Sequence, residues 1–374
     1  MDSTELLHWL RLLTTPTVGR VTARLLLREF GMPADVFAQT SAVLSSFVSA
    51  PQAQALSAIP KGLETLHAKT LDWLEEDPLQ RAAIPLGHPL YPSSLLGIAD
   101  PPLLLFVQGQ IQALPTAWDL CSSRGIAVVG SRNPTPQGSA TARAFSQSLA
   151  EHGCCIVSGL ALGIDGAAHE GALFAYTPSI ATIAVVGTGL DRVYPKAHHN
   201  LAHRIAEHGL LISEFPLGTP PHSSNFPLRN RIIAGLTKST LVVEAAVQSG
   251  SLITAQLALE QGKDVLAIPG SIHSPQSKGC HWLIKQGAKL VETAQDVLEE
   301  LAEQSVSMGS TICTPSNDAP PFLVHLGFEP SSIDELVARS GMNASHVQAA
   351  LTEMELDGLV ERLPGGMYLR SGKN

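Results

Sequence analysis

The chain has 374 residues, of which 44% are hydrophobic, and a formal net charge of −9. The length predicts two or three domains, and the acidic balance excludes a protein that coats nucleic acid with a generally basic surface, because such binding relies on Lys and Arg. No run of about 18 apolar residues predicts a membrane span, and Met1–Glu5 lack a signal-peptide pattern, so we expect a cytoplasmic protein with no membrane partner.

The five cysteines are predicted to be reduced thiols. None has the CxxC spacing of a zinc site, and the adjacent pair Cys154-Cys155 lies in an apolar run that fits core packing. We therefore expect no metal site.

Residues 1–80 are predicted to form a helical domain. Two apolar sets fall on helical faces: Leu6, Leu7, Leu10 and Leu13, then Leu25–Phe30. Pro16–Gly19, followed by a helix, is similar to a SAM-like or helix-hairpin-helix-like element whose amides can contact a DNA phosphate. Because only one such element is visible, a plain turn between helices is the interpretation that we favour.

Residues 81–304 are predicted to form a Rossmann-like, doubly wound α/β domain. Its first part, Pro85–Gly109, is rich in Pro and Leu and is expected to be an extended lead-in. After it, seven apolar runs alternate with helical patterns, which is typical of strands buried on both faces of a mostly parallel sheet. The runs are Ile126–Val129, Cys155–Val157, Ile183–Val186, Leu210–Ser213, Leu241–Val243, Val265–Ile268 and Lys289–Val291.

The polar stretch 305–321 is predicted to be a linker, and 322–374 a winged-helix domain. Helices are expected at Ile333–Arg339 and Ala344–Leu356, then a hairpin over Leu359–Leu369 that turns at Pro364–Gly366. The second helix carries Glu353, Glu355 and Asp357 and no Lys or Arg, unlike a helix that reads a DNA groove. We therefore favour a partner-binding or accessory role over DNA reading.

Positive charge concentrates in one part of the chain. Residues 121–235 hold eight Lys and Arg against six Asp and Glu, whereas the remainder holds 16 against 27. Any nucleic-acid site must therefore be local, and this segment contains most of the glycine-rich motifs.

The first motif follows the first predicted parallel strand. Gly130-Ser131-Arg132 precedes a loop that opens a helix, where backbone N–H groups and a helix N-terminus can collect an anion and Arg132 can clamp a phosphate. The GxGxxG fingerprint and the P-loop are both absent, which disfavours NAD binding and ATP hydrolysis. A structural turn with a solvated arginine is the alternative.

The second motif, Ser158-Gly159-Leu160-Ala161 with Asp165, fits a tight turn from strand to helix with an N-cap. Asp165 and His169 are four residues apart and could share a helix face for acid–base chemistry. We favour a capping residue and a histidine with satisfied hydrogen bonds.

Three further motifs place polar and aromatic groups after predicted strands. Tyr194 beside Lys196 offers a base-stacking surface and a phosphate charge, and Phe226 precedes Arg229-Asn230-Arg231 at a helix start. Arg229 and Arg231 cannot both face one side of a regular helix, so one of them is expected to be structural. Ser249-Gly250-Ser251 with Thr254 fits a phosphate-cradling turn. Phosphate-suited turns recurring on one rim of one sheet indicate a common site.

Taken in order, these motifs closely resemble the DNA-processing protein A (DprA/Smf) family. The match covers roughly 85–297 and also includes Gly187-Thr188-Gly189, Tyr194-Pro195, Ser213-Glu214-Phe215 and Phe226-Pro227. The helical N-terminal unit and the winged-helix tail resemble flanking domains that vary within that family.

This resemblance implies a homodimer without a cofactor that binds incoming single-stranded DNA during natural transformation and protects it. It also implies that the protein helps to load the recombinase RecA while overcoming single-strand binding protein. By position, Arg132 would be the main phosphate ligand, Lys196 a second cation, and Arg229 and Arg231 part of the pocket or its support. The expected role is binding without catalysis.

Two other functions remain open. A hydrolase of the lysine-decarboxylase-like type, acting on nucleoside monophosphates, would need a PGGxGTxxE signature, but 244–254 lack the glycine run and the following Glu. The second alternative is an adaptor whose acidic flanks recruit proteins and whose α/β domain is only a scaffold. Such an adaptor would not explain why cations concentrate at the glycine turns.

Overall fold

The computed structural model describes residues 1–306 except Tyr176 and Pro178, together with Phe322, Leu326, 331–356, 360–363 and 367–370. The chain divides into two compact units, Met1–Met308 and Gly309–Asn374. None of the helices in the described part is long and apolar enough to cross a membrane.

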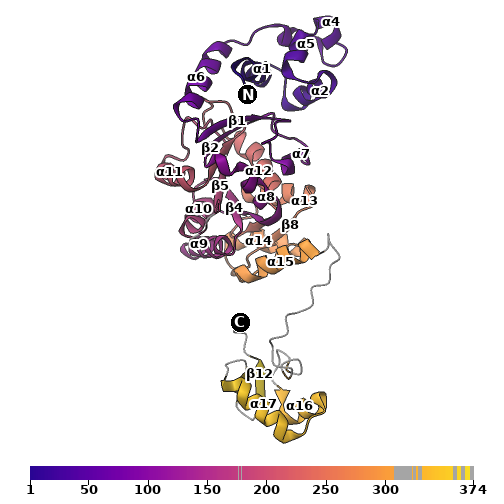
Figure 1. Ribbon diagram of the computed structural model, residues 1–374, viewed down its shortest axis with the longest axis vertical. Helices are drawn as coiled ribbons and strands as arrows, with labels where there is room; N and C mark the ends of the chain where they lie inside the picture. The colour runs from indigo at the N-terminus through magenta and orange to yellow at the C-terminus, as the bar shows by residue number, and fades with distance from the viewer. Residues whose placement is uncertain are drawn as a thin grey trace. The chain divides into compact units, whose positions relative to one another are not determined.

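The first unit begins with the expected helices, which gather at one end of the sheet (Figure 1). They are α1 Ser3–Thr14, α2 Arg20–Phe30, α3 Pro33–Ala38, α4 Ser41–Leu44, α5 Ala50–Ser57 and α6 Leu63–Glu76. Asp2 caps α1, because its Oδ1 accepts a hydrogen bond from Glu5 N at 2.7 Å. Leu6, Trp9, Leu10 and Leu26 are fully buried in the core of this helical region.

The central sheet has nine strands in the order β1-β2-β6-β5-β4-β3-β7-β8-β9. The seven predicted strands are confirmed and run parallel: β3 Gly125–Val129, β4 Cys155–Ser158, β5 Thr182–Val185, β6 Leu210–Ser213, β7 Ser239–Val242, β8 Asp264–Ala267 and β9 Lys289–Leu290. Since the chain leaves the centre toward β4 after β3 and in the opposite direction toward β8 after β7, the sheet is doubly wound.

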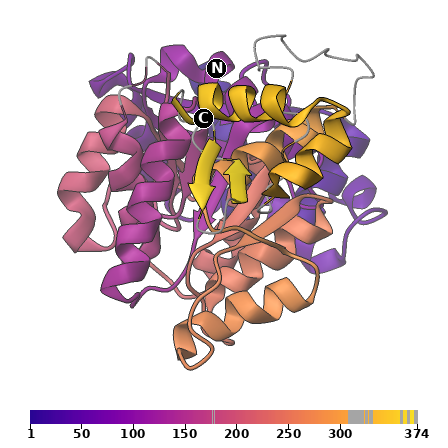
Figure 2. The same ribbon diagram turned by 90° about the horizontal axis from the view of Figure 1, so that it is seen from below.

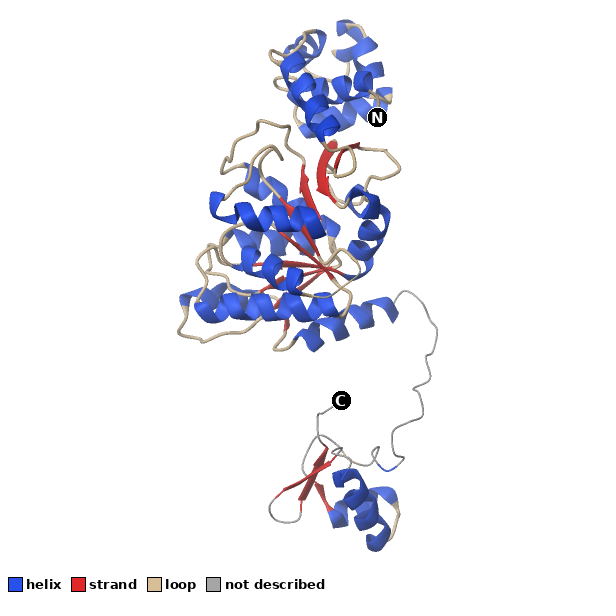
Figure 3. Ribbon diagram, turned by 60° about the vertical axis from the view of Figure 1, so that its left-hand side comes forward, coloured by secondary structure: helices blue, strands red, loops and turns tan. Residues whose placement is uncertain are grey.

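Helices cover both faces of the sheet (Figure 3). One face packs against α8 Leu114–Arg124, α12 Asn225–Leu236, α13 Gly250–Glu260 and α14 Lys278–Lys285. The other packs against α9 Pro136–Glu151, α10 Ile164–Phe174, α11 His199–His208 and α15 Ala294–Val306.

The prediction of an extended lead-in over Pro85–Gly109 was only partly correct, because this region completes the sheet. β1 Arg81–Pro85 and β2 Leu104–Gly109 form an antiparallel edge on β6, with α7 Ser93–Leu96 between them. β2 alternates with a period of two: Leu104 and Phe106 enter the helical N-terminal core, whereas Leu105 and Val107 enter the core of the sheet. The helices and the α/β region therefore share one compact unit.

The second unit contains β10 Ser331–Ser332, α16 Ile333–Ser340, α17 Ala344–Leu356, β11 Val360–Leu363 and β12 Met367–Arg370. The strands pair antiparallel in the order β10-β12-β11, and the β11–β12 hairpin is drawn in yellow in Figure 2. Leu336, Val347 and Leu351 are fully buried in its core. These helices and the hairpin agree with the winged-helix prediction.

Several predicted features fall outside the described residues: the linker beyond Val306, Asp357 and the turn at Pro364–Gly366. Ser305 and Val306, predicted as the start of the linker, instead end α15.

Phe106 tests how firmly the N-terminal helices are joined to the sheet. Its ring is fully buried and meets Trp73 edge-on, with 6.4 Å between ring centroids. Phe106→Ala should lower the free energy of unfolding by about 3–5 kcal/mol, measured by urea denaturation, because it leaves a cavity between two packed layers. Leu79→Ala, at a side chain that is 66% exposed, is the control and should stay within about 0.5 kcal/mol. Equal effects in both variants would contradict this packing.

Candidate functional site

A cleft of about 790 Å³ opens beyond the carboxyl ends of β3 and β7. These two strands are neighbours, yet the chain leaves them toward opposite sides of the sheet. This is the switch point at which open α/β sheets bind ligands. The cleft is lined by parts of the loops after β3, β4, β5, β6, β7 and β8 and by α12.

Most of the residues predicted for a phosphate site line this cleft. They are Gly130, Ser131, Arg132, Arg229, Asn230, Ser249, Gly250, Ser251 and Thr254, with the aromatic residues Tyr194 and Phe226. Ser158, Gly159, Lys196 and Arg231 are absent from its lining.

The loop after β3 is held by Glu244, a residue that the sequence analysis did not select. The backbone of Ser131 donates to Glu244 O at 2.6 Å, and the Glu244 carboxylate accepts from Thr135 N at 2.9 Å and Thr135 Oγ1 at 2.6 Å. Thr135 in turn caps α9 through Gly138 N at 2.9 Å. A Cβ at Gly138 would lie 2.3 Å from Glu244 Cδ, so glycine is required there.

This arrangement corrects the expectation that the N-terminus of α9 collects an external anion. The carboxylate of Glu244 already occupies that position. The hydroxyl of Ser131 is also engaged, since it accepts from Asn133 N at 3.1 Å and donates to Gln276 Oε1 at 3.4 Å. What this loop offers to a ligand is therefore the side chain of Arg132.

Arg132 and two aromatic rings form a row in the cleft. The Arg132 guanidinium carbon lies 5.2 Å from the centroid of the Phe226 ring, and Phe226 lies 5.8 Å from Tyr194 with 30° between their planes. Arg132 is exposed and makes no ion pair with any residue that the structure describes. Tyr194 is 45% exposed. The row combines an exposed cation with the exposed ring of Tyr194, and the half-buried Phe226 ring lies between them.

The N-terminus of α13 is a second element of the cleft. Ser249 caps the helix by accepting from Ser251 N at 3.3 Å, and its hydroxyl contacts Ser251 Oγ at 2.7 Å. A Cβ at Gly250 would meet no described atom within 4 Å, so the space above this helix start is open. The Asn230 amide reaches Gly250 O at 3.4 Å. An anion can approach the α13 dipole here.

Arg229 lines the cleft with a buried side chain that also packs against the loop after β4. It is 3% exposed, its Nη1 donates to Val185 O at 2.8 Å, and a Cβ at Gly159 would lie 1.5 Å from that Nη1. Burial lowers the pKa of Arg229 to about 10, while Asp165 opposes the shift, so the guanidinium stays charged at neutral pH.

Ser158 and Gly159 belong to the support of the cleft. Ser158 Oγ donates to Val128 O at 2.6 Å across the sheet, and Gly159 N donates to Asp165 Oδ2 at 3.2 Å. Asp165 also accepts from Ala161 N at 3.4 Å, whereas Gly163 is the N-cap of α10. The predicted capping role of Asp165 was thus wrong: its carboxylate binds the preceding loop.

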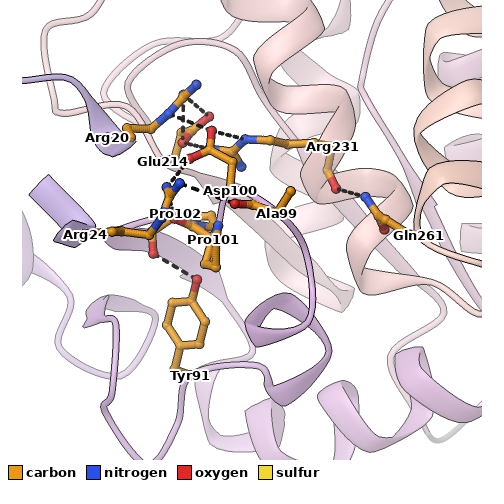
Figure 4. A network of polar contacts seen from close by, with 10 residues as sticks. All are labelled: Arg20, Arg24, Tyr91, Ala99, Asp100, Pro101, Pro102, Glu214, Arg231 and Gln261. Atoms are coloured by element: carbon orange, nitrogen blue, oxygen red, sulfur yellow. Dashed lines mark hydrogen bonds and ion pairs between the residues drawn. The ribbon is translucent and has the colours of Figure 1, made fainter. Parts of the chain in front are cut away.

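Arg231 does not line the cleft but belongs to an ion-pair network in which Arg231 and Glu214 are buried and the other members are half-buried (Figure 4). Its Nε lies 3.1 Å from Asp100 Oδ2, and its Nη2 pairs with Glu214. Arg20 of α2 reaches the same carboxylates at 3.0 and 3.3 Å, and Arg24 pairs with Asp100. Arg229 and Arg231 leave α12 on different sides, as their spacing requires.

The network shifts the pKa values of its two acids in opposite directions. Burial raises the pKa of Asp100, but Arg231, Arg24 and Arg20 outweigh burial and hold that pKa below its ordinary value. For Glu214 burial dominates and the pKa is raised, although Arg231 and Arg20 oppose it. The arginines of α2 and Arg231 of α12 thus pair with the same two carboxylates, and these shared ion pairs connect α2 to α12.

Lys196 lies outside the cleft, on an exposed 3-10 turn spanning Lys196–His198. It makes no ion pair with a described residue and stands two residues after Tyr194. Its place is therefore beside the aromatic row rather than within the cleft.

The prediction that His169 has satisfied hydrogen bonds was only half correct: the ring is buried in α10, and only one of its nitrogens has a partner among the described residues. Thr182 Oγ1 donates to Ile156 O, so it accepts from His169 Nδ1 at 2.7 Å, and Nε2 has no partner among the described residues. Burial lowers the pKa of His169 to about 3, with His198 and Arg229 adding to the shift. Neutral His169 is a structural group. No cluster of three metal-ligating side chains occurs in the described part of the chain.

Comparison with known proteins identifies relatives across the chain. The model of the DNA recombination-mediator protein A family matches residues 82–302, and a DprA winged helix domain matches 310–366. Protein Smf of Escherichia coli is 40% identical over 99% of this chain and 96% of its own, and DNA processing protein DprA of Streptococcus pneumoniae is 49% identical over 56% of this chain and 71% of its own.

Two solved structures are also similar. That of DprA from Streptococcus pneumoniae has a TM-score of 0.62 and 36% identity, covering 80% of this chain and 98% of its own. A structure of DNA processing protein A from Helicobacter pylori, described for its single-stranded DNA binding mode, has a TM-score of 0.53 and 28% identity, covering 60% of this chain and 97% of its own.

His169 should make the protein less stable in acid. Its folded pKa is below the ordinary 6.5, so its stabilising contribution is complete above pH 6.5 and is lost as the pH falls toward 3. Between pH 6.5 and 5 this loss amounts to about 2 kcal/mol, and His169→Asn should remove it. Urea denaturation of both proteins at the two pH values measures the difference, and parallel losses in both would show that His169 does not titrate as described.

Proposed function

The chain belongs to the DNA recombination-mediator protein A family, and we propose that it binds single-stranded DNA in the cleft between the loops after β3 and β7. The observation that carries this proposal is the row of Arg132, Phe226 and Tyr194 beside the open N-terminus of α13. A cation and a helix N-terminus hold phosphates, and exposed ring faces stack on bases.

Stacking on Phe226 and Tyr194 requires bases whose faces are free. In a duplex those faces are covered by neighbouring base pairs, whereas a single strand can splay its bases onto the rings. The Helicobacter pylori relative, described for its single-stranded DNA binding mode, supports the same ligand.

In the cell, the protein would act on incoming DNA during natural transformation and recombination in the cytoplasm. It would protect the strand and help load the recombinase RecA while overcoming single-strand binding protein. Family membership supports this role, as does the name "DNA processing protein" of several relatives. RecA filament assembly on a strand coated with single-strand binding protein, with and without this chain, tests it: no acceleration by the chain would contradict it.

The role proposed is binding without catalysis. Asp165 is the only acidic residue among the described residues lining the cleft, and its carboxylate is engaged by the amides of Gly159 and Ala161. Glu244, the one glutamate in the 244–254 segment, has its carboxylate bound to Thr135. Release of free base from a nucleoside monophosphate would favour that hydrolase instead.

We also propose that the protein forms a homodimer through the β9 end of the sheet. In the described part of the chain no strand pairs with the outer edge of β9. Trp282 and Leu290, next to this edge, are 44% and 45% exposed. A second copy would cover these apolar side chains and place two clefts on one strand, which raises apparent affinity through effective concentration.

Arg132→Ala tests the binding site. Arg132, Arg229 and Lys196 should together give a log–log slope of affinity against salt of about −2 for a single strand, and the variant should weaken binding and reduce the slope by about 0.7. Fluorescence anisotropy of labelled single strands and duplexes at several salt concentrations measures both. Arg28→Ala, at an exposed arginine on α2 paired with Glu29, is the matched control. Equal binding of duplex and single strand, or an unaffected Arg132→Ala variant, would refute the proposal.

Trp282→Glu tests the dimer. A charge on this face should yield monomers at micromolar concentration in analytical ultracentrifugation and weaken binding to long strands. Leu79→Glu places the same charge on another exposed apolar side chain, on the loop between α6 and β1, and should leave the dimer intact. A Trp282→Glu protein that remains dimeric would exclude this surface.

A further inference from the structure

A second cavity of about 690 Å³ adjoins the cleft on the far side of Tyr194. Tyr194 lines both spaces, and the loop after β4 divides them, because Ala161 lines the cleft while Leu160 lines the second cavity. This loop is held firmly: Asp165 accepts from Gly159 N and Ala161 N, and His198 Nδ1 lies 3.0 Å from Leu160 O. The two cavities are therefore neighbours that share one exposed aromatic ring.

The second cavity has an apolar floor and a polar rim. The floor consists of buried side chains at the ends of β5 and β6 and in nearby loops, including Leu160, Val186, Leu211 and Leu217. The rim is formed by α6 of the N-terminal region and by α11, which contributes His199 and His203. An apolar floor with a few polar groups at its edge suits a flat heterocycle, and the volume falls within the usual range of small-ligand pockets, about 300–1,000 Å³.

The face of α6 that lines the second cavity carries positive charge at one end and negative charge further along. Lys69, Asp72, Trp73 and Glu76 line the cavity at spacings that place them on one face of the helix. At one end Asp191 pairs with both Lys69, at 2.7 Å, and Arg192, at 3.2 Å, which leaves one surplus positive charge. Further along, Glu76 pairs with Arg81 at 2.6 Å.

Asp72 makes no hydrogen bond or ion pair with a residue that the structure describes, and it is exposed at the rim. The cavity thus offers a cationic end beside Tyr194 and a free carboxylate acceptor further along α6. A nucleotide has the complementary pattern when its base carries an amino group, since its phosphate is an anion and its exocyclic amine is a donor. A carboxylate accepts such a bond from cytosine N4, whereas thymine presents the O4 acceptor at the same position.

We propose that this second cavity binds the base of a nucleotide flanking those in the cleft, and that Asp72 selects a base with an exocyclic amino group. The proposal rests on the single-strand binding proposed above and names a subsite beyond it. The strand passes over Tyr194, its phosphate meets Lys69 and Arg192, and its base lies on the apolar floor under α6. The N-terminal helices thereby take part in recognition.

The test compares labelled oligo(dC) and oligo(dT) of about twelve nucleotides, long enough to occupy both cavities. The native protein should bind oligo(dC) about three- to tenfold more tightly than oligo(dT), the effect of one hydrogen bond to a charged acceptor at a partly exposed rim. Asp72→Asn should reduce this ratio toward one. Glu75→Gln removes an equal charge from an exposed position of α6 outside the cavity lining and should keep the ratio, although it changes the general repulsion of phosphates.

The arms of this experiment separate the subsite from the main site. If Arg132→Ala abolishes binding while oligo(dC) and oligo(dT) bind the native protein equally, the cleft stands and the subsite is overturned. A preference for oligo(dC) that persists in Asp72→Asn, or that Glu75→Gln removes equally, also overturns it. If neither oligonucleotide binds the native protein, the proposed function itself fails.

Discussion

Two carboxylates, those of half-buried Asp100 and buried Glu214, hold together the parts of the molecule from which the cleft is made. They pair with Arg20 and Arg24 from α2 and with Arg231 from α12, so the helical N-terminal region, the end of β6 and α12 meet in one network. Buried ion pairs add little net stability over well-packed apolar groups, but loss of one partner leaves an uncompensated charge at a cost of about 3–5 kcal/mol. The network therefore fixes where α12 lies, and α12 carries Phe226, Arg229 and Asn230.

A second constraint is that the glycine-rich loops are already occupied by the protein's own carboxylates. Glu244 fills the N-terminus of α9, and Asp165 binds the amides of the loop after β4. Both loops look like phosphate cradles in sequence, yet their donors are used internally. What stays available is Arg132, the start of α13 and the exposed ring of Tyr194. This combination suits a polymer of phosphates and unstacked bases better than a dinucleotide.

The two cavities give the N-terminal helices a role beyond covering an edge of the sheet. Because β2 alternates between the helical core and the sheet core, α6 is placed beside the loops that follow β4 and β5. Tyr194 then stands at the junction of both spaces. The same antiparallel edge thus packs Phe106 against Trp73 in the interior and places Asp72 at the rim of the second cavity, where we propose that it contacts a base.

The sequence by itself predicted the parallel sheet and selected residues most of which line one cleft. Short apolar runs that alternate with helical patterns are typical of strands buried on both faces, and glycines with hydroxyl residues after them mark the turns at the carboxyl edge. It also indicated that Arg229 and Arg231 serve different purposes, because side chains two positions apart on a helix are rotated by about 200° around its axis. It could not decide which one enters the cleft. That choice depends on Asp100 and Glu214, which are distant in sequence and approach Arg231 only after folding. The position of Glu244 at the start of α9 also depends on contacts between residues distant in sequence. So does the formation of β1 and β2, because both faces of this edge are covered only when the N-terminal helices pack against the sheet.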